Sequence, residues 1–455
     1  MNAHATDWAT GRQRSLDDVA GLCRGADRGA ARALELLIRE PLTPVHEMLA
    51  DHGVGLPAVR EAYRIAREDP RFAAVVRSPF YEHKLAYSFA TTMLTQWRDD
   101  GDELLRLLRG GDGASRTVEI HPTKDSCGYK CAMCLWSDRR TDALLPLRPK
   151  TDLMSTADWL ATLDELVAEG VRSVVVSGGG EPLLNPEIGT ILDHCHEVGL
   201  RYDIYTTGFQ LRSMSDRTLA AIGRARNLRL SIHSPFEDVY STITGLPEHT
   251  RPLRRVLDGV QRLREAGATC AIGAGFVILP DNVGLVSDMV AFARAEQFDS
   301  LQFRAESVDA TEALGAEAVA LLRTQLRDVQ LAALAEDGPA IDISDDLTRL
   351  ANGQPMGRAR LITGNCWAKA FRPTIDPAGY IAPCDLKAEP RFRVEDMFLG
   401  RIDPVDRDAF RRAAGRHVPD DCEQCMPSSR AGNLIWTKLA ADLGAGVLPA
   451  DQPFA

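Results

Sequence analysis

Six short runs rich in β-branched residues alternate with amphipathic helical patterns across the middle of this 455-residue chain. The helical segments between the runs are long enough for crossover connections, which are typical of parallel strands. One helix is expected at residues 155–169, where Ser155 and Asp158 form a capping arrangement and Trp159 and Leu163 share the apolar face. The expected strands are residues 117–121, 173–177, 202–206, 228–233, 270–278 and 300–304. We therefore predict an α/β fold, a partial (β/α)6 barrel, with its chemistry at the C-terminal ends of the strands.

The segments on either side of the barrel differ from it in pattern. Residues 1–115 show apolar residues at helical spacing without an alternating strand pattern, which predicts a helical N-terminal domain. A long helix is expected at residues 312–336, and a hairpin at 373–383 that turns at 376–379. Further helices are expected at 405–414 and 428–443. The predicted domains are thus residues 1–115 (helical), 116–340 (barrel) and 341–455 (a small C-terminal domain).

Composition argues against several classes of protein. The formal net charge is -11 and the arginines are scattered, which disfavours a nucleic-acid surface. No run of about 18 apolar residues is present to span a membrane. The first residues lack the pattern of a secretory signal, so a cytoplasmic location is expected. There the ten cysteines would stay reduced and available as metal ligands.

Three closely spaced cysteines directly follow the first expected strand. Cys127, Cys131 and Cys134 have the spacing Cys-x-x-x-Cys-x-x-Cys. Because four thiolates complete an iron–sulfur cluster, three leave one iron open to another ligand. The alternative is a zinc knuckle with a distant fourth ligand, although zinc sites more often show two Cys-x-x-Cys pairs. The position at a strand end favours the cluster.

The run Cys-Gly-Tyr-Lys-Cys-Ala-Met-Cys at residues 127–134 resembles the signature of the radical S-adenosylmethionine (SAM) superfamily. Ser-Gly-Gly-Gly-Glu-Pro at residues 177–182 is similar to the family's motif for the SAM amine. The resemblance, over roughly residues 115–305, implies a [4Fe–4S] cluster that binds SAM and releases a 5′-deoxyadenosyl radical. Met133 departs from the aromatic residue that many members carry before the last cysteine. The implied SAM contacts are Met133, Gly178, Gly179, Gly180, Glu181, Ser231 and Arg304.

A second group of cysteines lies near the C-terminus. Cys366, Cys384, Cys422 and Cys425 surround and follow the expected hairpin. This arrangement resembles a Twitch domain, a shortened SPASM module that holds one auxiliary [4Fe–4S] cluster. The alternative is a four-cysteine zinc site.

Several segments resemble the radical SAM subgroup that modifies sugars in antibiotic pathways. This subgroup includes the apramycin-pathway paromamine diol-dehydratase and the desosamine-pathway amino-sugar deaminase. The resemblance implies dehydration of a vicinal diol on an aminoglycoside or related sugar. It also implies flavodoxin or ferredoxin as electron donor, and an NAD(P)H-dependent reductase acting on the product. The candidate acid–base residues are polar residues at expected strand ends: His121, Asp125, Tyr205, His233 and Glu306.

Other functions stay open at this stage. A sugar dehydrogenase could pass an electron to the auxiliary cluster, whereas an epimerase would need a hydrogen donor, usually a thiol. Peptide maturases with SPASM or Twitch domains often carry a leader-binding domain with strands, and residues 1–115 show no strand pattern. A non-catalytic zinc or cluster scaffold would have no need of Glu181 and its glycine motif.

Overall fold

The computed structural model describes residues 28–39, 115–134 with short gaps, 153–305, 314–351 with gaps, 366–388 and 400–402, together with scattered positions in 52–65 and residue 441. These residues form one ten-stranded sheet in the order β10-β9-β8-β1-β2-β3-β4-β5-β6-β7. Neighbouring strands from β1 to β7 pair in parallel. They are β1 (Thr117–Ile120), β2 (Ser173–Val176), β3 (Arg201–Thr206), β4 (Asn227–Ser231), β5 (Ala271–Ile278), β6 (Ser300–Ala305) and β7 (Ala340–Ile343). The six predicted strands are confirmed, and β7 adds a parallel strand that was not predicted.

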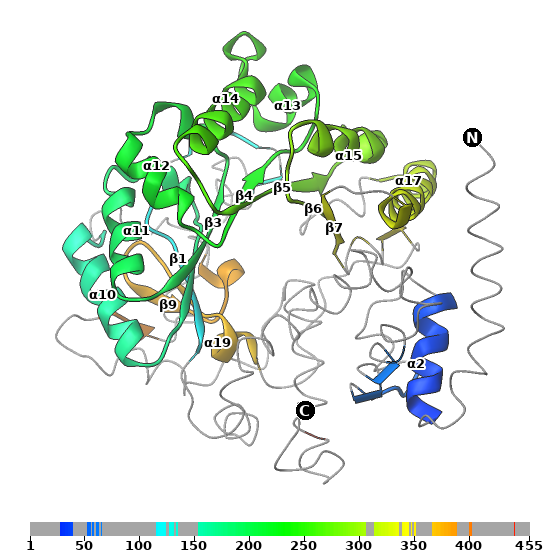
Figure 1. Ribbon diagram of the computed structural model, residues 1–455, viewed down its shortest axis with the longest axis horizontal. Helices are drawn as coiled ribbons and strands as arrows, with labels where there is room; N and C mark the ends of the chain where they lie inside the picture. Colours follow the sequence, from blue (N-terminus) through cyan, green and yellow to red (C-terminus); the bar gives the residue numbers. More distant parts are fainter. Residues whose placement is uncertain are drawn as a thin grey trace.

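Helices cover the outer side of the curved sheet (Figure 1). They are α10 (Thr156–Ala168), α11 (Ile188–Glu197), α12 (Asp216–Gly223), α13 (Glu237–Thr244), α14 (Pro252–Glu265), α15 (Val286–Ala295) and α17 (Ala316–Ala335). The predicted capping box of α10 is present, because Ser155 Oγ accepts from the Asp158 amide and Asp158 accepts from the Ser155 amide. In the N-terminal region, α2 (Arg28–Arg39) confirms one stretch of expected helix. No helix in the described part of the chain has the length and apolar character to cross a membrane.

The two faces of the sheet differ in chemistry. Strand residues such as Val176 on β2 and Leu230 on β4 face the helices and are fully buried in the apolar core. Their neighbours in each strand point to the opposite face because side chains alternate. That second face carries polar and charged residues, which the strand register places in rows: Glu119, Asp203, Tyr205, Arg229, Gln302 and Asp342. We call it the polar face. Parallel strands buried on both faces are usually apolar throughout, so this alternation sets the inner face of the sheet apart from its helix-covered face.

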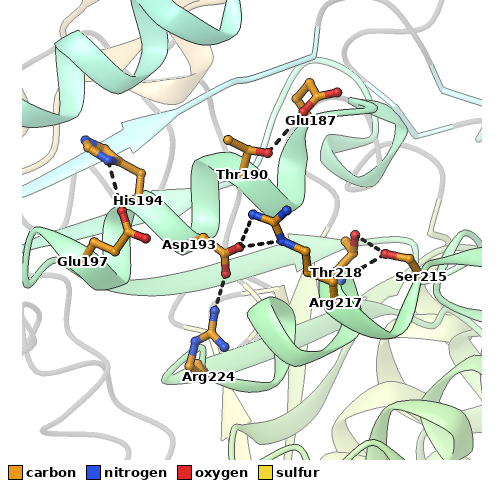
Figure 2. Close-up of polar contacts among 9 residues, drawn as sticks. All are labelled: Glu187, Thr190, Asp193, His194, Glu197, Ser215, Arg217, Thr218 and Arg224. Atoms are coloured by element: carbon orange, nitrogen blue, oxygen red, sulfur yellow. Dashed lines mark hydrogen bonds and ion pairs between the residues drawn. The ribbon is translucent and has the colours of Figure 1, made fainter.

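Ion pairs on the outer surface tie α11 to α12. Asp193 on α11 accepts hydrogen bonds from Arg217 of α12 and from Arg224, which directly follows that helix, and the Arg217 Nη2–Oδ2 distance is 3.1 Å (Figure 2). Each pair lies at the protein surface, where such contacts contribute about 0–1 kcal/mol. This cluster therefore fixes how two covering helices pack and lies on the outer side, away from the polar face.

A C-terminal hairpin extends the sheet beyond β1. Its strands are β8 (Thr374–Ile375) and β9 (Tyr380–Ala382), and β10 (Gly400–Arg401) pairs with β9. At the predicted turn, Asp376 Oδ1 accepts from the amides of Ala378 and Tyr380. The hairpin is therefore confirmed, whereas its parallel pairing with β1 was not predicted. Most of residues 1–115 lies outside the described residues, as do the helices expected at 405–414 and, apart from residue 441, at 428–443. The domain boundaries therefore stay predictions.

Candidate functional site

The cysteine loop (residues 127–134) follows β1 at the C-terminal edge of the sheet and is docked against α13. The Lys130 amide donates to the Thr244 carbonyl at 2.8 Å. The Tyr129 ring packs edge-on against Tyr240 on α13, with centroids 6.3 Å apart, and their hydroxyls are 3.1 Å apart. Because Tyr240 also donates to the Ser231 carbonyl at the end of β4, the loop is held against both the helix and the sheet.

Gly245 makes this close approach possible. It ends α13 with a φ of +67°, a conformation that L residues other than glycine rarely adopt. A Cβ at this position would lie 3.0 Å from both Cβ and the carbonyl oxygen of Lys130. Glycine is therefore required here both by the backbone conformation and by the docked loop.

The three thiols of the cysteine loop provide the kind of donor that an iron–sulfur cluster needs. Cys127 is exposed and Cys131 and Cys134 are half-buried, and all three lie within electrostatic reach of one another. Local desolvation of its thiol, followed by the nearby Glu181 and Cys134, raises the pKa of Cys127 to about 11. Among the described residues, no three His, Cys, Asp or Glu side chains converge tightly enough to hold one metal ion.

Glu181 follows β2 and lies buried at the same edge of the sheet. Its carboxylate accepts from the Leu183 amide at 3.0 Å, from the Thr207 amide at 2.7 Å and from the Thr206 hydroxyl. Burial raises the pKa of Glu181, although these three donors oppose the shift. The carboxylate therefore links the ends of β2 and β3 within reach of Cys127.

A buried charge cluster lies directly beneath this edge. Glu119 on β1 accepts from Arg372 Nε at 2.9 Å and also from Arg372 Nη2. Its other oxygen accepts from Ser177 Oγ and lies 3.2 Å from His121 Nε2. Burial raises the pKa of the Glu119 carboxyl, but Arg372, with His121 and Ser177, outweighs it and holds this pKa well below the usual range. The cluster connects the C-terminal segment to the first residue of the glycine motif.

Farther along the polar face, a chain of contacts joins side chains of β3, β4, β6 and β7. The Arg229 guanidinium stacks 3.6 Å above the Tyr205 ring and donates to Gln302 Oε1 at 2.8 Å. Gln302 in turn donates to Asp342 on β7 at 2.6 Å. Arg229 crosses over Gly275 on β5 to reach β6, and a Cβ at position 275 would be in ordinary van der Waals contact with Arg229 Cδ at 3.5 Å. Tyr205 is thus held face-on by a cation at the level of the third strand.

His233 lies just beyond β4 and is almost fully buried. Its Nδ1 accepts the Val277 amide at 3.2 Å, and Asn282 donates to its carbonyl at 2.8 Å. Burial, followed by the charge of Arg229, lowers the pKa of His233 to about 4. The ring is therefore neutral at pH 7, with its proton on Nε2.

The structure places the predicted site residues unevenly. His121, Tyr205 and His233 lie on or beside the polar face, whereas Asp125 and Glu306 lie outside the described residues. The predicted SAM contacts Met133, Gly178, Gly179, Gly180, Glu181, Ser231 and Arg304 are all described, and all lie at or near the C-terminal ends of the strands.

Gly178 is closely surrounded, because a Cβ there would lie 3.2 Å from the Gly180 carbonyl oxygen. The side chain of Arg304 on β6 makes no hydrogen bond or ion pair within the described part of the chain. Its guanidinium is therefore available to a ligand.

The second cysteine group is only partly described. Cys366 is buried and precedes α19 (Ala368–Phe371), and Cys384 is half-buried after β9. Cys422 and Cys425 lie outside the described residues, so a site formed by all four stays a prediction.

Glu119, Arg229, Gln302 and Arg372 were not identified from the sequence. The available signal was the polar residue inside short strand patterns such as Thr-Val-Glu-Ile at residues 117–120. The partners of these residues come from distant strands, and no local pattern identifies them.

Comparison with known proteins finds similarity in the central segment of the chain. Residues 122–292 match the model of the Radical SAM superfamily. The chain is 26% identical over 253 residues to dTDP-4-amino-4,6-dideoxy-D-glucose ammonia-lyase of Streptomyces venezuelae, covering 55% of this chain and 50% of that protein. It is 29% identical over 182 residues to GTP 3′,8-cyclase 2 of Pseudomonas aeruginosa, covering 38% of this chain and 50% of that protein. The matched region thus spans about half the length of these relatives.

Solved structures share only a distant likeness. SuiB of Streptococcus suis is 16% identical, with a TM-score of 0.45 over 79% of this chain and 76% of that chain. Native anSMEcpe with bound AdoMet is 13% identical, with a TM-score of 0.48 over 66% of this chain and 80% of that chain.

Proposed function

We propose that the chain is a radical SAM enzyme that dehydrates a vicinal diol of an aminoglycoside or related sugar, on the basis that residues 122–292 match the model of the Radical SAM superfamily. The observation that carries the proposal is the shared position of the cysteine loop and Glu181. Both lie at the C-terminal edge of one parallel sheet, above a polar face. A sugar offers many hydroxyl groups, and the polar face offers donors and acceptors to match them.

Cys127, Cys131 and Cys134 would hold a [4Fe–4S] cluster, and Glu181, Ser231 and Arg304 would contact SAM. When bound, these groups would supply a 5′-deoxyadenosyl radical that removes a hydrogen atom from a carbinol carbon of the sugar. Residues of the chain would then move two protons. One residue takes the proton of that carbinol hydroxyl, and another protonates the neighbouring hydroxyl as it leaves as water. The α-carbonyl radical that remains would take up one electron from the external reductant and one proton to give the carbonyl product.

His121 and Tyr205 are the described candidates for these proton transfers. His121 Nε2 lies 3.2 Å from the Glu119 carboxylate, an arrangement that orients an imidazole for proton transfer. Tyr205 is half-buried on the polar face, with its ring fixed by Arg229. Asp125 and Glu306 remain sequence-based candidates.

Loss of ammonia from an amino sugar is the second candidate reaction. Similarity to the dTDP-4-amino-4,6-dideoxy-D-glucose ammonia-lyase favours it, because elimination of an amine needs the same hydrogen abstraction and a protonated leaving group. A sugar dehydrogenase, an epimerase and a peptide maturase are the remaining alternatives.

One experiment separates these reactions. The anaerobically prepared enzyme is incubated with dithionite, SAM and a panel containing paromamine, dTDP-4-amino-4,6-dideoxy-D-glucose and leader peptides. We expect mass spectrometry to detect 5′-deoxyadenosine and loss of water from a sugar. Loss of ammonia from a sugar would replace the proposed dehydration with elimination of an amine. Loss of two hydrogens would replace it with a dehydrogenation. Formation of 5′-deoxyadenosine by the Cys127→Ala variant would refute radical SAM chemistry at this loop.

Cys366, Cys384, Cys422 and Cys425 would hold an auxiliary [4Fe–4S] cluster in a Twitch-like domain. A reconstituted chain should then contain about eight irons, since each cluster carries four. Four irons with one zinc would instead assign the second group to zinc. A flavodoxin or ferredoxin would supply electrons in the cell, and an NAD(P)H-dependent reductase would act on the carbonyl product.

A further inference from the structure

His233 has one ring nitrogen committed to the fold and one that is available. Strand β4 ends at Ser231, so the Val277 amide of β5 lacks a backbone partner at this level, and His233 Nδ1 accepts from it. Since Nδ1 accepts a hydrogen bond, the proton of the neutral ring lies on Nε2. The low pKa of about 4, which follows from burial and from Arg229, keeps the ring in this form at neutral pH.

The position of the ring is fixed from a second side. Asn282 is fully buried and donates through Nδ2 to the carbonyl oxygens of His233 and Val277, at 2.8 Å each. Its own Oδ1 accepts from the Leu279 amide at 2.7 Å. The asparagine therefore holds the loops after β4 and β5 together, and the His233 backbone cannot move without breaking this arrangement.

Nε2 of His233 remains available. Among the described residues, no group accepts the proton of Nε2. Nε2 is also not completely enclosed by protein atoms, so it differs from the fully buried polar atoms that lack a partner. His233 alternates with Arg229 and Ser231 along the same stretch of chain, and Val277 pairs with Arg304 in the sheet. Val277 on β5 therefore lies between His233, just beyond the end of β4, and Arg304, near the end of β6. The Nε2–H of His233 and the available guanidinium of Arg304 come from these two neighbouring strand ends.

We propose that His233 is a ligand-binding residue whose fixed Nε2–H, together with Arg304, forms a two-donor site for an oxygen-rich or anionic group at the C-terminal edge of the sheet. This proposal rests on the proposed function and assigns His233 a binding role in place of the acid–base role expected from the sequence. Two donors without an acceptor select a carboxylate, a phosphate or a sugar oxygen. The oxygen could belong to SAM or to the sugar, and the experiment distinguishes these sources.

Two variants test the Nε2–H. In His233→Asn, the side-chain oxygen replaces Nδ1 and still accepts from Val277, whereas the Nε2–H donor is lost. In His233→Gln, the terminal amide occupies the position of Nε2 and can still donate. We expect His233→Asn to melt at the wild-type temperature and to bind one ligand roughly 2- to 13-fold more weakly, the range for one hydrogen bond. His233→Gln should bind that ligand more tightly than His233→Asn.

Binding is measured on the anaerobically prepared holoenzyme, with SAM alone and with dTDP-4-amino-4,6-dideoxy-D-glucose or paromamine in the presence of SAM. Weaker SAM binding assigns the oxygen to SAM, and weaker sugar binding alone assigns it to the sugar. Unchanged affinity for all three probes in a folded His233→Asn variant overturns the proposal. Failure of His233→Asn to fold while His233→Gln folds also overturns the proposal, since that outcome indicates a structural role for His233.

A wild-type structure with SAM and the sugar bound decides the matter if neither variant folds. An acceptor oxygen of either ligand within about 3.2 Å of Nε2 supports the proposal, and contacts of Nε2 to protein or water alone overturn it. The formation of 5′-deoxyadenosine by the wild type is measured in parallel. Its absence would count against the proposed function, whereas the binding data test His233 independently.

Discussion

Replacement of Arg372 by methionine should reveal how strongly the C-terminal segment is bound to the barrel. In the wild type, Glu119 is almost fully buried and accepts two hydrogen bonds from this one guanidinium. Breaking a buried ion pair by removing one partner costs about 3–5 kcal/mol, because the remaining charge stays unpaired. Ser177 and His121 still contact Glu119, and Arg372 is a quarter exposed, so we expect a loss of about 3 kcal/mol. Total stabilities are typically about 5–15 kcal/mol, so this loss is easily measured.

The matched control is the double variant Glu119→Gln/Arg372→Met. It removes both charges, yet the glutamine oxygen can still accept from Ser177. Since replacing both members of a buried pair is often neutral, its unfolding free energy should lie within about 1 kcal/mol of the wild type. Urea unfolding followed by circular dichroism provides the measurement. The reasoning is wrong if the single variant unfolds at the wild-type urea concentration, or if the double variant is no more stable than the single one.

The ion pair of Glu119 and Arg372 also predicts that the unfolding free energy depends on pH. The pKa of Glu119 in the folded chain lies well below its ordinary value of 4.5, so the ion pair contributes its full stability above that value. The contribution decreases as the pH falls from about 4.5 toward the folded-state pKa. The difference in stability between the wild type and Arg372→Met should therefore narrow in acid. A difference that stays constant down to about pH 3 would contradict this assignment.

Three smaller predictions concern the edge of the sheet and its helices. Gly245→Ala should lower the unfolding free energy by about 1–2 kcal/mol because of the φ of +67°, and should lower the iron bound per chain because the new methyl group meets Lys130. A wild-type iron content and melting temperature in this variant would contradict the docking of the cysteine loop. Ser155→Ala removes the α10 capping box and should cost about 1 kcal/mol in urea unfolding while the iron content stays unchanged. Thr206→Val removes a donor to Glu181 and should raise the KM for SAM about tenfold, with Thr206→Ser restoring it; equal KM values for both variants would exclude this role.

Local patterns in the sequence predicted the elements whose signals are local. The β-branched runs gave strands β1 to β6, and Ser155 with Asp158 gave the start of α10. The pairing of β8 with β1 could not be predicted, because it joins segments about 250 residues apart and each strand of the hairpin is short. No motif signals such long-range pairing.

The candidate site shows the same division. Cysteine spacing and the glycine motif identified the residues at the edge of the sheet, since their signal lies within a few positions. The role of His233 depended on Val277 and Asn282, which lie 44 and 49 residues farther along the chain. A strand-end histidine suggested proton transfer, and only the contact of its Nδ1 with the Val277 amide indicates that Nε2 carries the proton and can donate it.

The pairing of β1 with the C-terminal segment also has a consequence for the order of events during synthesis. The amides of Glu119 and His121 donate to the carbonyls of Pro373 and Ile375, and 253 positions separate Glu119 from Arg372. At about 5–20 residues per second, a ribosome needs roughly 13–50 s to produce that length. Throughout this interval one edge of β1 has no strand to pair with and Glu119 has no counter-charge, and residues 122–292 are complete well before the interval ends. An open strand edge invites pairing with other chains, so the nascent chain is most exposed to aggregation just before the hairpin of β8 and β9 emerges.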